Sequence, residues 1–228
     1  EAMPKLVSGQ AVILAAGEGM RLRPLTEDVP KALIPMKGKY LIEYALQSLP
    51  PCVEEVLIVT GYRGSDIESA LGQVYQSLPL SYVKQREKKG TAGALWSAQR
   101  FLKKGYFLVL NGDDIYHKDD VAPFCVEEFA FGYTKTEARG KMLSAIIKEN
   151  HFYGFTRPHS GDAICLGTNV FTLDHRIFNQ DLVLLPSGEY GLPQTLALIA
   201  QSEPVRAHHF HSWFPINTEE DITRYQNL

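Results

Sequence analysis

Cysteine is scarce in this sequence, which has three cysteines among 228 residues. Cys52, Cys125 and Cys165 lie far apart, are odd in number, and include no pair separated by only two residues. This pattern indicates neither a zinc knuckle nor a disulfide framework. A reducing, cytoplasmic setting is the simplest interpretation of such cysteine usage.

Long apolar runs and a strong excess of one charge are also missing. No run approaches the ~20 apolar residues of a membrane span. The first ten residues have neither the apolar core nor the cleavage site of a signal peptide. The formal net charge of −3 does not suggest the basic stripe that nucleic-acid binding favours. We therefore expect no membrane and no nucleic acid as partners, and an anionic ligand would be held by local groups.

The sequence does contain alternating strand and helix patterns, in a length that suits one large α/β domain of up to roughly 250 residues. Short apolar runs predict strands, and apolar residues at helical spacing predict the helices between them. The expected strands are 12–15, 54–60, 80–85 and 106–110, and the expected helices are 39–49, one within 61–75, and 91–102 with Thr91 as its cap. This order predicts an α/β protein with a doubly wound, mainly parallel, Rossmann-like sheet flanked by helices.

Beyond residue 120 the pattern is less regular. Strands are expected at 141–148, 167–173 and 204–214, and helices at 190–201 and 218–226. No Pro/Gly/Ser-rich linker marks a domain boundary. We therefore expect a single domain over residues 1–228, with one half at 11–120 and a substrate-side half at 121–228.

Polar segments follow three of the expected strands, at 15–19, at Gln85 and at 111–114. Parallel sheets bind ligands outside the carboxyl ends of their strands. These segments are therefore expected to converge on one crevice.

Two glycines, Gly17 and Gly19, follow the first expected strand. They do not form a dinucleotide-binding fingerprint, because Leu22 stands where the third glycine would be, and no Walker loop is present. What remains is Gly-x-Gly-x-Arg: the glycines allow backbone N–H groups to approach phosphates, and Arg21 adds a charge-assisted fork. Lys31, flanked by prolines, could neutralise charge on a transferring phosphoryl group. A surface turn with two solvated cations is the alternative.

Three segments, in order, carry a resemblance to a known family. They are LAAGEGMRLRPLTEDVPKALIP (14–35), QREKKGTAGALWSA (85–98) and LNGDDI (110–115). Together they resemble the sugar-1-phosphate nucleotidyltransferases, also called nucleoside-diphosphate-sugar pyrophosphorylases. The fit covers residues 11 to about 115 well and the remainder loosely. The resemblance implies the nucleotidyltransferase fold, with nucleotide and metal bound by the 11–120 half and sugar phosphate by the 121–228 half.

The resemblance also implies roles for individual residues. Arg21 would hold the triphosphate and the leaving pyrophosphate, Lys31 would contact the phosphates, and Asp113 would ligate Mg²⁺. Gln85 would pair with the base, and its amide suits the imide edge of uracil or thymine. An exposed loop glutamine and a simple turn at Asp113 are the alternatives. Further nucleotide-binding positions would be Leu14, Ala15, Ala16, Gly17, Gly19, Gly90 and Thr91.

A second metal ligand is expected from a late segment, which here is Trp-Phe-Pro-Ile-Asn-Thr. Pro215 stands where many family members carry an aspartate, and Asn217 can serve instead, as it does in some members. Alternatively, Asn217 or Thr218 only caps the following helix, since Thr218 with Asp221 fits a capping box.

The sugar side departs further from the family pattern. Within FTRP (155–158), Thr156 and Arg157 replace the glutamate and lysine of a common Glu-Lys-Pro motif. The tentative sugar-phosphate contacts are Asp114, Gly154, Arg157 and Glu189. Asp114 could instead be a second metal ligand or a helix cap. A zinc site at His209 and His211 is disfavoured, because no Cys or acidic ligand lies beside them in the sequence.

We therefore predict a compact Mg²⁺-dependent enzyme that transfers a nucleotidyl group from UTP or dTTP to a sugar 1-phosphate and releases pyrophosphate. Two alternatives stay open. One is a cytidylyltransferase for a small phosphorylated alcohol such as phosphocholine, which would need an aromatic cage for a quaternary ammonium. The other is a non-catalytic regulatory subunit that binds nucleotide-sugar. An oligomer is possible in each case.

Overall fold

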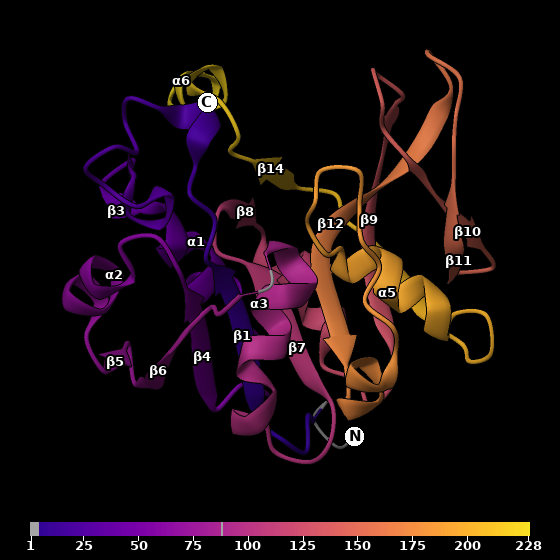
Figure 1. The fold of residues 1–228 in the computed structure, drawn as a ribbon, viewed down its shortest axis with the longest axis horizontal. Helices are drawn as coiled ribbons and strands as arrows, with labels where there is room; N and C mark the ends of the chain where they lie inside the picture. The colour runs from indigo at the N-terminus through magenta and orange to yellow at the C-terminus, as the bar shows by residue number, and fades with distance from the viewer. Residues whose placement is uncertain (1–4, 88) are drawn as a thin grey trace.

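A mixed β-sheet with helices on both faces organises the computed structural model, which describes residues 5–87 and 89–228 (Figure 1). Among these residues, ten strands form the sheet in the order β10-β11-β13-β9-β12-β7-β1-β4-β6-β5. The strands are β1 (Gln10–Ala15), β4 (Glu55–Thr60), β5 (Val74–Tyr75), β6 (Leu78–Lys84), β7 (Phe107–Asn111), β9 (Ala130–Glu137), β10 (Ser144–Lys148), β11 (His151–Thr156), β12 (Ala163–Leu173) and β13 (Arg206–His209). The predicted fold class is confirmed.

Parallel pairing is concentrated in the first half of the chain. Strands β6, β4, β1 and β7 lie side by side and run in the same direction. In the second half, β12 is antiparallel to both β7 and β9, and β10 and β11 pair antiparallel at the far edge. The carboxyl ends of the four parallel strands therefore share one edge, as the strand-end argument requires.

Strand β1 shows why these runs form a central sheet. Val12 and Leu14 belong to the hydrophobic cluster on one face, and Ala11 and Ile13 belong to the cluster on the other. Successive side chains of a strand point to opposite faces, so a continuous apolar run requires cover on both sides. This explains the absence of polar residues between Ala11 and Ala15.

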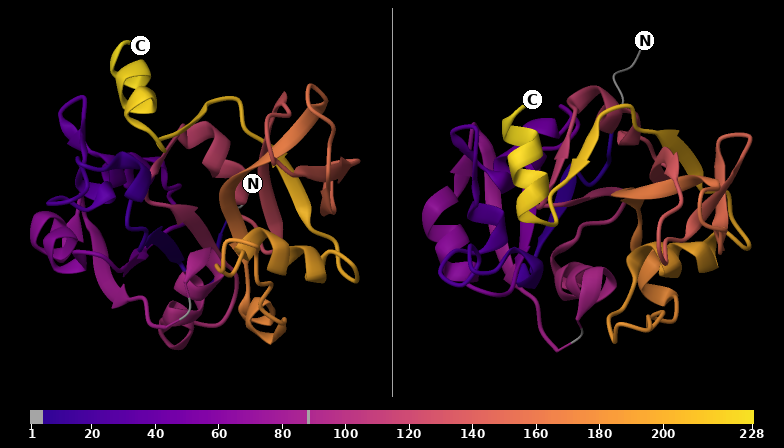
Figure 2. Two further views of the ribbon diagram at one scale, coloured as in Figure 1. Left: turned by 45° about the horizontal axis from the view of Figure 1, so that its top comes forward. Right: turned by 90° about the horizontal axis from the view of Figure 1, so that it is seen from above.

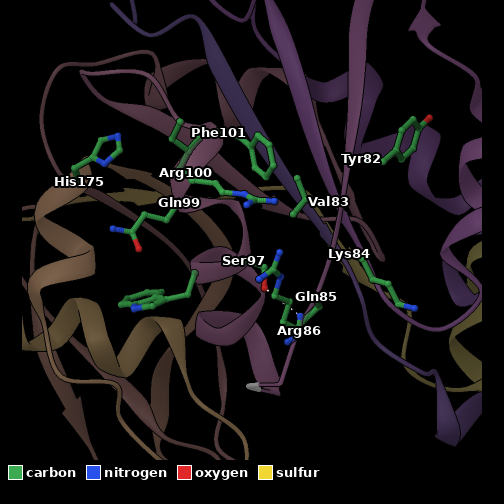
Figure 3. A pocket seen from close by; sticks show the side chains of 12 residues that line it. Tyr82, Val83, Lys84, Gln85, Arg86, Ser97, Gln99, Arg100, Phe101 and His175 are labelled. Atoms are coloured by element: carbon green, nitrogen blue, oxygen red, sulfur yellow. Dashed lines mark hydrogen bonds between the residues drawn. The ribbon is translucent and has the colours of Figure 1, made fainter.

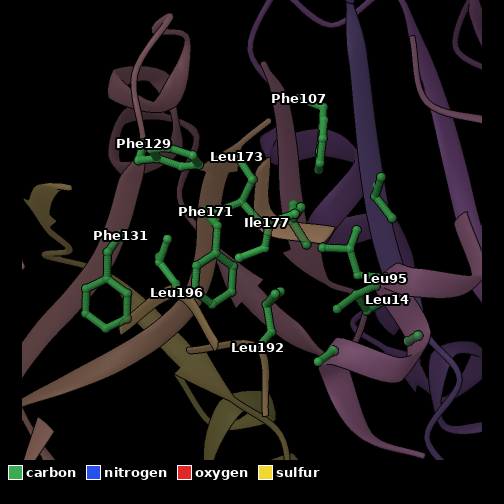
Figure 4. Packing of buried hydrophobic residues seen from close by; sticks show 14 of the residues in the cluster. Leu14, Leu95, Phe107, Phe129, Phe131, Phe171, Leu173, Ile177, Leu192 and Leu196 are labelled. Atoms are coloured by element: carbon green, nitrogen blue, oxygen red, sulfur yellow. The ribbon is translucent and has the colours of Figure 1, made fainter. Parts of the chain in front are cut away.

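Helices supply that cover on both faces. On one face, α3 (Gly90–Ala98) and α5 (Leu192–Ile199) contribute to a cluster that Figure 4 shows with the leucines and phenylalanines of the central strands. On the other, α1 (Leu41–Ser48), α2 (Gly64–Leu71) and α4 (Lys118–Val121) contribute Ile42, Ile67 and Val121. The described residues also form short 3-10 helices: η1 (Met20–Leu22), η2 (Lys31–Leu33), η3 (Gln99–Phe101), η4 (Ala122–Phe124) and η5 (His175–Asn179).

The chain end returns to the first half of the sequence. Strand β14 (Trp213–Pro215) pairs antiparallel with β8 (Asp114–Tyr116), and β2 (Pro35–Met36) pairs with β3 (Lys39–Tyr40). Helix α6 (Glu219–Gln226) then packs Ile222 in a third cluster with Leu22 and Leu41. Figure 2 shows this last helix over the N-terminal part of the chain. The expected strand 204–214 is thus two strands, in different sheets.

In the described residues, no helix is both long and apolar enough to cross a membrane.

The expectation of unpaired cysteines is wrong for two of the three. Cys52, in the turn before β4, and Cys125, after η4, form a disulfide with their Cα atoms 6.3 Å apart, while Cys165 in β12 is free. The pair is separated by 73 residues and meets because α1 and α4 contact each other on the same face of the sheet. Spacing alone could not show this pairing. Cysteine usage therefore no longer supports the expectation of a reducing, cytoplasmic setting.

Removal of this disulfide is expected to lower the free energy of unfolding. A cross-link between residues this far apart restricts the unfolded chain and stabilises by about 4 kcal/mol. Urea unfolding of Cys52→Ala should show such a loss, whereas Cys165→Ala should lack the loop-entropy contribution. Thiol titration of the unreduced, denatured protein should find one thiol per chain; three thiols would contradict the pairing.

Candidate functional site

A cavity of about 640 Å³ lies at the carboxyl ends of the parallel strands. Its lining includes twelve of the predicted site residues: Leu14, Ala16, Gly17, Gly19, Arg21, Lys31, Gln85, Gly90, Thr91, Asp113, Glu189 and Asn217. It also includes Glu18 and Asn111, which belong to the segments expected to converge there but had no individual role assigned. The other lining residues were not predicted: Met20, Gly61, Tyr62, Arg86, Lys89 and Ala94. Gly61 and Tyr62 directly follow β4, so the strand-end rule could have found them.

The glycine loop after β1 forms one wall of the cavity. Gly19 has φ +63°, and a Cβ there would lie 2.9 Å from Thr26 Cγ2 and 3.1 Å from Lys31 Cβ. The Thr26 hydroxyl donates to the Gly19 carbonyl at 2.7 Å. Glycine is therefore required at position 19 both for the left-handed backbone and for the close approach of Lys31. Leu22, which stands where a dinucleotide-binding fingerprint would have its third glycine, is fully buried and anchors the loop in the third cluster.

Lys31 and Asp113 form an ion pair, with Nζ 2.7 Å from Oδ2. Lys31 starts η2 and is 9% exposed, which is unusual for an ammonium group. Burial of a lysine is costly unless it is paired, so Asp113 accounts for its position. Arg21 lines the same cavity with an exposed side chain.

Asp113 reaches the loop because of the glycine before it. The Gly112 N–H donates to the Leu14 carbonyl at 2.8 Å. A Cβ at Gly112 would lie 3.1 Å from Ile13 Cγ2 and 3.2 Å from Ala15 Cβ, which is closer than most side-chain contacts allow. The turn between β7 and β8 therefore docks directly on the end of β1. Ala15 supports this contact but is not among the residues lining the cavity.

Asp114 is buried, at 3% exposed, and does not line the cavity. Its Oδ2 accepts from Trp213 Nε1 at 3.2 Å and Asn169 Nδ2 at 3.4 Å, and lies 3.1 Å from the Tyr116 hydroxyl. Burial, and then the charge of Asp113, raise the pKa of Asp114 to about 7. The carboxyl group thus links β8, β12 and β14 beneath the cavity.

Asn217 lies between β14 and α6 and faces the same cavity as Asp113. Pairing of Pro215 with Asp114 brings this segment back to the turn that carries Asp113. The Asn217 N–H donates to Asp221 Oδ2 at 2.8 Å, and Thr218 and Asp221 form the predicted capping box. The cap is therefore at Thr218, and Asp221 also holds the backbone of Asn217.

Gln85 is held at the opposite end of the cavity. Its N–H donates to the Thr60 carbonyl at 2.7 Å, and its Nε2 donates to the Gly90 carbonyl at 3.2 Å. Gly90 has φ +91°, and a Cβ there would lie 2.5 Å from the Tyr190 carbonyl oxygen. The segment before α5 thus packs against the start of α3 and brings Glu189 to the lining.

The structure corrects the predicted role of Thr91 as the cap of α3. The helix begins at Gly90, with no side-chain cap at its N-cap residue. The Thr91 hydroxyl instead accepts the Leu192 N–H at 3.0 Å, which is the first N–H of α5. Thr91 therefore joins the two helices that flank this end of the cavity.

Three of the four tentative sugar contacts, Asp114, Gly154 and Arg157, do not line this cavity. Gly154 is in β11, where a Cβ would lie 3.9 Å from Ala197 of α5, and Arg157 is exposed just beyond that strand. Neither Gly154, Arg157 nor Asp114 lines the cavity, whereas Glu189 does. His209 stacks on Tyr133, and within the described ranges no group of three His, Cys, Asp or Glu could hold a metal ion.

Asp113 and Asn217 nevertheless offer a donor set that suits magnesium. They supply a carboxylate and a side-chain carbonyl, and both residues line the cavity. Mg²⁺ prefers oxygen ligands and usually keeps several waters, so it is commonly bound by one or two protein groups together with substrate phosphates. The donors present here fit that mode and not a cage built from protein side chains alone.

Comparisons with known proteins identify the family of this chain. The model of the family described as nucleotidyl transferase matches residues 10–155. The chain is 31% identical, over 95% of its length and 96% of the relative's, to a UTP–glucose-1-phosphate uridylyltransferase of Haloferax volcanii. It is 36% identical to the bifunctional protein GlmU of Methanococcus vannielii, but spans only 54% of that protein.

Solved structures show the same fold. A putative glucose-1-phosphate thymidylyltransferase from Bacillus anthracis superposes with a TM-score of 0.83 at 22% identity, covering 96% of this chain and 94% of the other. An inositol-1-phosphate CTP transferase from T. maritima superposes with a TM-score of 0.76 at 22% identity, covering 99% and 95%. The family match and the near full-length relative show that this chain is an enzyme of the nucleotidyl transferase family.

Proposed function

We propose that this enzyme transfers a uridylyl or thymidylyl group from UTP or dTTP to a hexose 1-phosphate, with Mg²⁺ as its metal ion. The Lys31–Asp113 pair carries the proposal, because it puts a buried cation and a candidate metal ligand on one wall of the cavity. The name of the haloarchaeal relative supports UTP and glucose 1-phosphate as the first substrates to test.

The reaction requires stabilisation of negative charge and correct placement of the attacking oxygen. Backbone N–H groups of the glycine loop approach the phosphates, and Arg21 neutralises the leaving pyrophosphate. Lys31 contacts the phosphate at the reacting centre from its fixed position beside Asp113. A magnesium ion held by Asp113 and Asn217 supplies further charge neutralisation when bound.

Nucleobase selection is assigned to Gln85. Its side-chain amide has a donor and an acceptor, which complement the imide edge of uracil or thymine. The Gly90 carbonyl accepts one amide hydrogen and fixes the orientation of the group. Glu189, on the neighbouring segment, stays the candidate for a sugar hydroxyl.

An aromatic cage for a quaternary ammonium needs several rings, whereas Tyr62 is the aromatic residue in the lining of this cavity. The lining therefore does not favour phosphocholine as the acceptor, and an assay with CTP and phosphocholine tests this alternative directly. The non-catalytic alternative predicts bound nucleotide-sugar without pyrophosphate release.

Pyrophosphate release tests the proposal and its two charged residues. The wild type should release pyrophosphate from UTP or dTTP with glucose 1-phosphate and Mg²⁺, and chelation should abolish the reaction reversibly. Lys31→Ala and Asp113→Ala should each lower kcat by roughly 10²–10³, because each removes an electrostatic stabiliser. The matched controls Lys141→Ala and Asp181→Ala change exposed residues elsewhere and should retain activity. No pyrophosphate from any pair of triphosphate and phosphorylated acceptor would refute the proposal.

Gln85→Glu tests nucleobase selection. A carboxylate cannot donate to a carbonyl of uracil, so kcat/KM for UTP should fall by about 10–100-fold, whereas CTP should lose less. Gln201→Glu, an exposed change in the turn after α5, is the control. Equal losses for UTP and CTP would indicate a structural effect of Gln85 and not base recognition.

Two substitutions of Asp114 test its role as a shared hydrogen-bond acceptor beneath the cavity. Asp114→Ala deprives the Trp213 and Asn169 donors of their acceptor and should lower the free energy of unfolding by about 2–4 kcal/mol. Asp114→Asn keeps an acceptor oxygen and should cost about 1 kcal/mol. Urea unfolding gives both values. Equal losses would mean that the shared acceptor is unimportant.

A further inference from the structure

A second cavity lies apart from most of the predicted site residues and shares only Gln85 and Arg86 with the first. It has a volume of about 930 Å³ and lies between the end of β6, helix α3 and η3 (Figure 3). Its lining comes from four segments: Tyr82 to Arg86, Trp96 and Ser97, Gln99 to Leu102, and His175. This volume is within the range of ordinary small-molecule sites, about 300–1,000 Å³.

Three cations line this second cavity, and no carboxylate does. They are Lys84, Arg86 and Arg100. Within residues 5–87 and 89–228, none of the three forms an ion pair with a carboxylate. By contrast, Arg176 and Arg206, elsewhere on the surface, each have an acidic partner. A concave surface with one sign of charge and no internal counter-charge favours a multiply charged anion.

Aromatic surface lies beside the cations. Phe101 is 45% exposed, and the Arg100 guanidinium lies over its ring, 4.7 Å from the centroid. Figure 3 shows Arg100 crossing the cavity below Phe101, toward Val83. Trp96 is half-buried and held edge-on against Phe178. An exposed ring and an arginine plane are surfaces on which a planar heterocycle stacks.

The polar groups of the lining are also fixed in place. The Ser97 hydroxyl donates to the Gly93 carbonyl at 3.1 Å and accepts the Arg86 N–H at 3.3 Å. Arg86 is thereby attached to α3 at its backbone, while its guanidinium stays without a carboxylate partner. Attachment of the Arg86 backbone to α3 through Ser97 lowers the entropic cost of binding an anion there.

We propose that this second cavity binds a nucleoside diphosphate moiety, with its phosphates on Arg86 and Arg100 and its base beside Phe101. This site is separate from the cavity assigned to the reaction, and the proposal does not depend on the proposed function. Arg86 and Gln85 line both cavities. Occupancy of one cavity therefore alters the affinity of the other, and the effect is reciprocal.

Binding stoichiometry tests the site with UDP, which lacks a γ-phosphate to transfer. Isothermal titration should find two UDP molecules per wild-type chain. Arg100→Glu reverses a charge that lines only the second cavity, so the variant should bind one UDP. Arg139→Glu is the matched control, since Arg139 is exposed in the β9–β10 connection and should leave both sites intact. Arg100→Ala should weaken the second site by about tenfold, the effect of losing one charged hydrogen bond.

Three further results have fixed meanings. The double variant Arg21→Ala, Lys31→Ala should keep one UDP, and that UDP should be lost when Arg100→Glu is added. Inorganic triphosphate that binds as tightly as UDP at the second site would overturn the nucleotide assignment. If the wild type and Arg100→Glu bind the same number of UDP molecules, the second site does not exist. If no pyrophosphate is released but Arg100→Glu still removes one UDP, the proposed function fails and this site stands.

Discussion

The docking of the β7–β8 turn on the end of β1 is the constraint on which the site depends. The bond from Gly112 N–H to the Leu14 carbonyl closes this contact, and only a residue without Cβ fits it comfortably. The contact places Asp113 beside the glycine loop, where it pairs with Lys31 at 2.7 Å. Gly19 in turn allows Lys31 to approach. Two glycines far apart in the sequence therefore position one ion pair, and their backbone geometry matters more than any side chain they could carry.

Sequence patterns predicted this first half well because its determinants are local. Continuous apolar runs correspond to β1, β4 and β7, and the polar segments after them converge as strand-end geometry requires. Ala16, Gly17, Gly19, Gln85 and Asp113 line one cavity for that reason. Lys31, Gly90, Thr91, Glu189 and Asn217, which line it too, were predicted from the family resemblance and not from strand ends. Helix ends were less accurate: the expected helix 39–49 starts at Leu41 after the short strand β3, and Thr91 caps a different helix from the one expected.

The second half was harder to predict because its determinants are contacts between distant segments. Strands β9 and β11 were missed, since β9 passes from a buried start to an exposed, polar end and β11 contains a glycine with φ +124°. The 204–214 run divides where the chain leaves β13 at His209 and enters β14 at Trp213. The disulfide and the shared acceptor at Asp114 likewise join residues more than 50 positions apart. None of these leaves a periodic signal.

Long-range contacts of the same kind control the nucleobase end of the cavity. Gln85 follows β6, but its surroundings are set by α3 and by the segment before α5, through bonds from Tyr190 N–H to the Lys89 carbonyl and from Leu192 N–H to Thr91. In the proposed reaction, base selection would therefore depend on packing between the two halves of the chain and not on Gln85 alone. The two cavities meet at Gln85 and Arg86, so a ligand in the second cavity would act on this same junction. Its effect should consequently be on nucleotide affinity more than on the Lys31–Asp113 centre, because that pair is fixed by separate contacts at the end of β1.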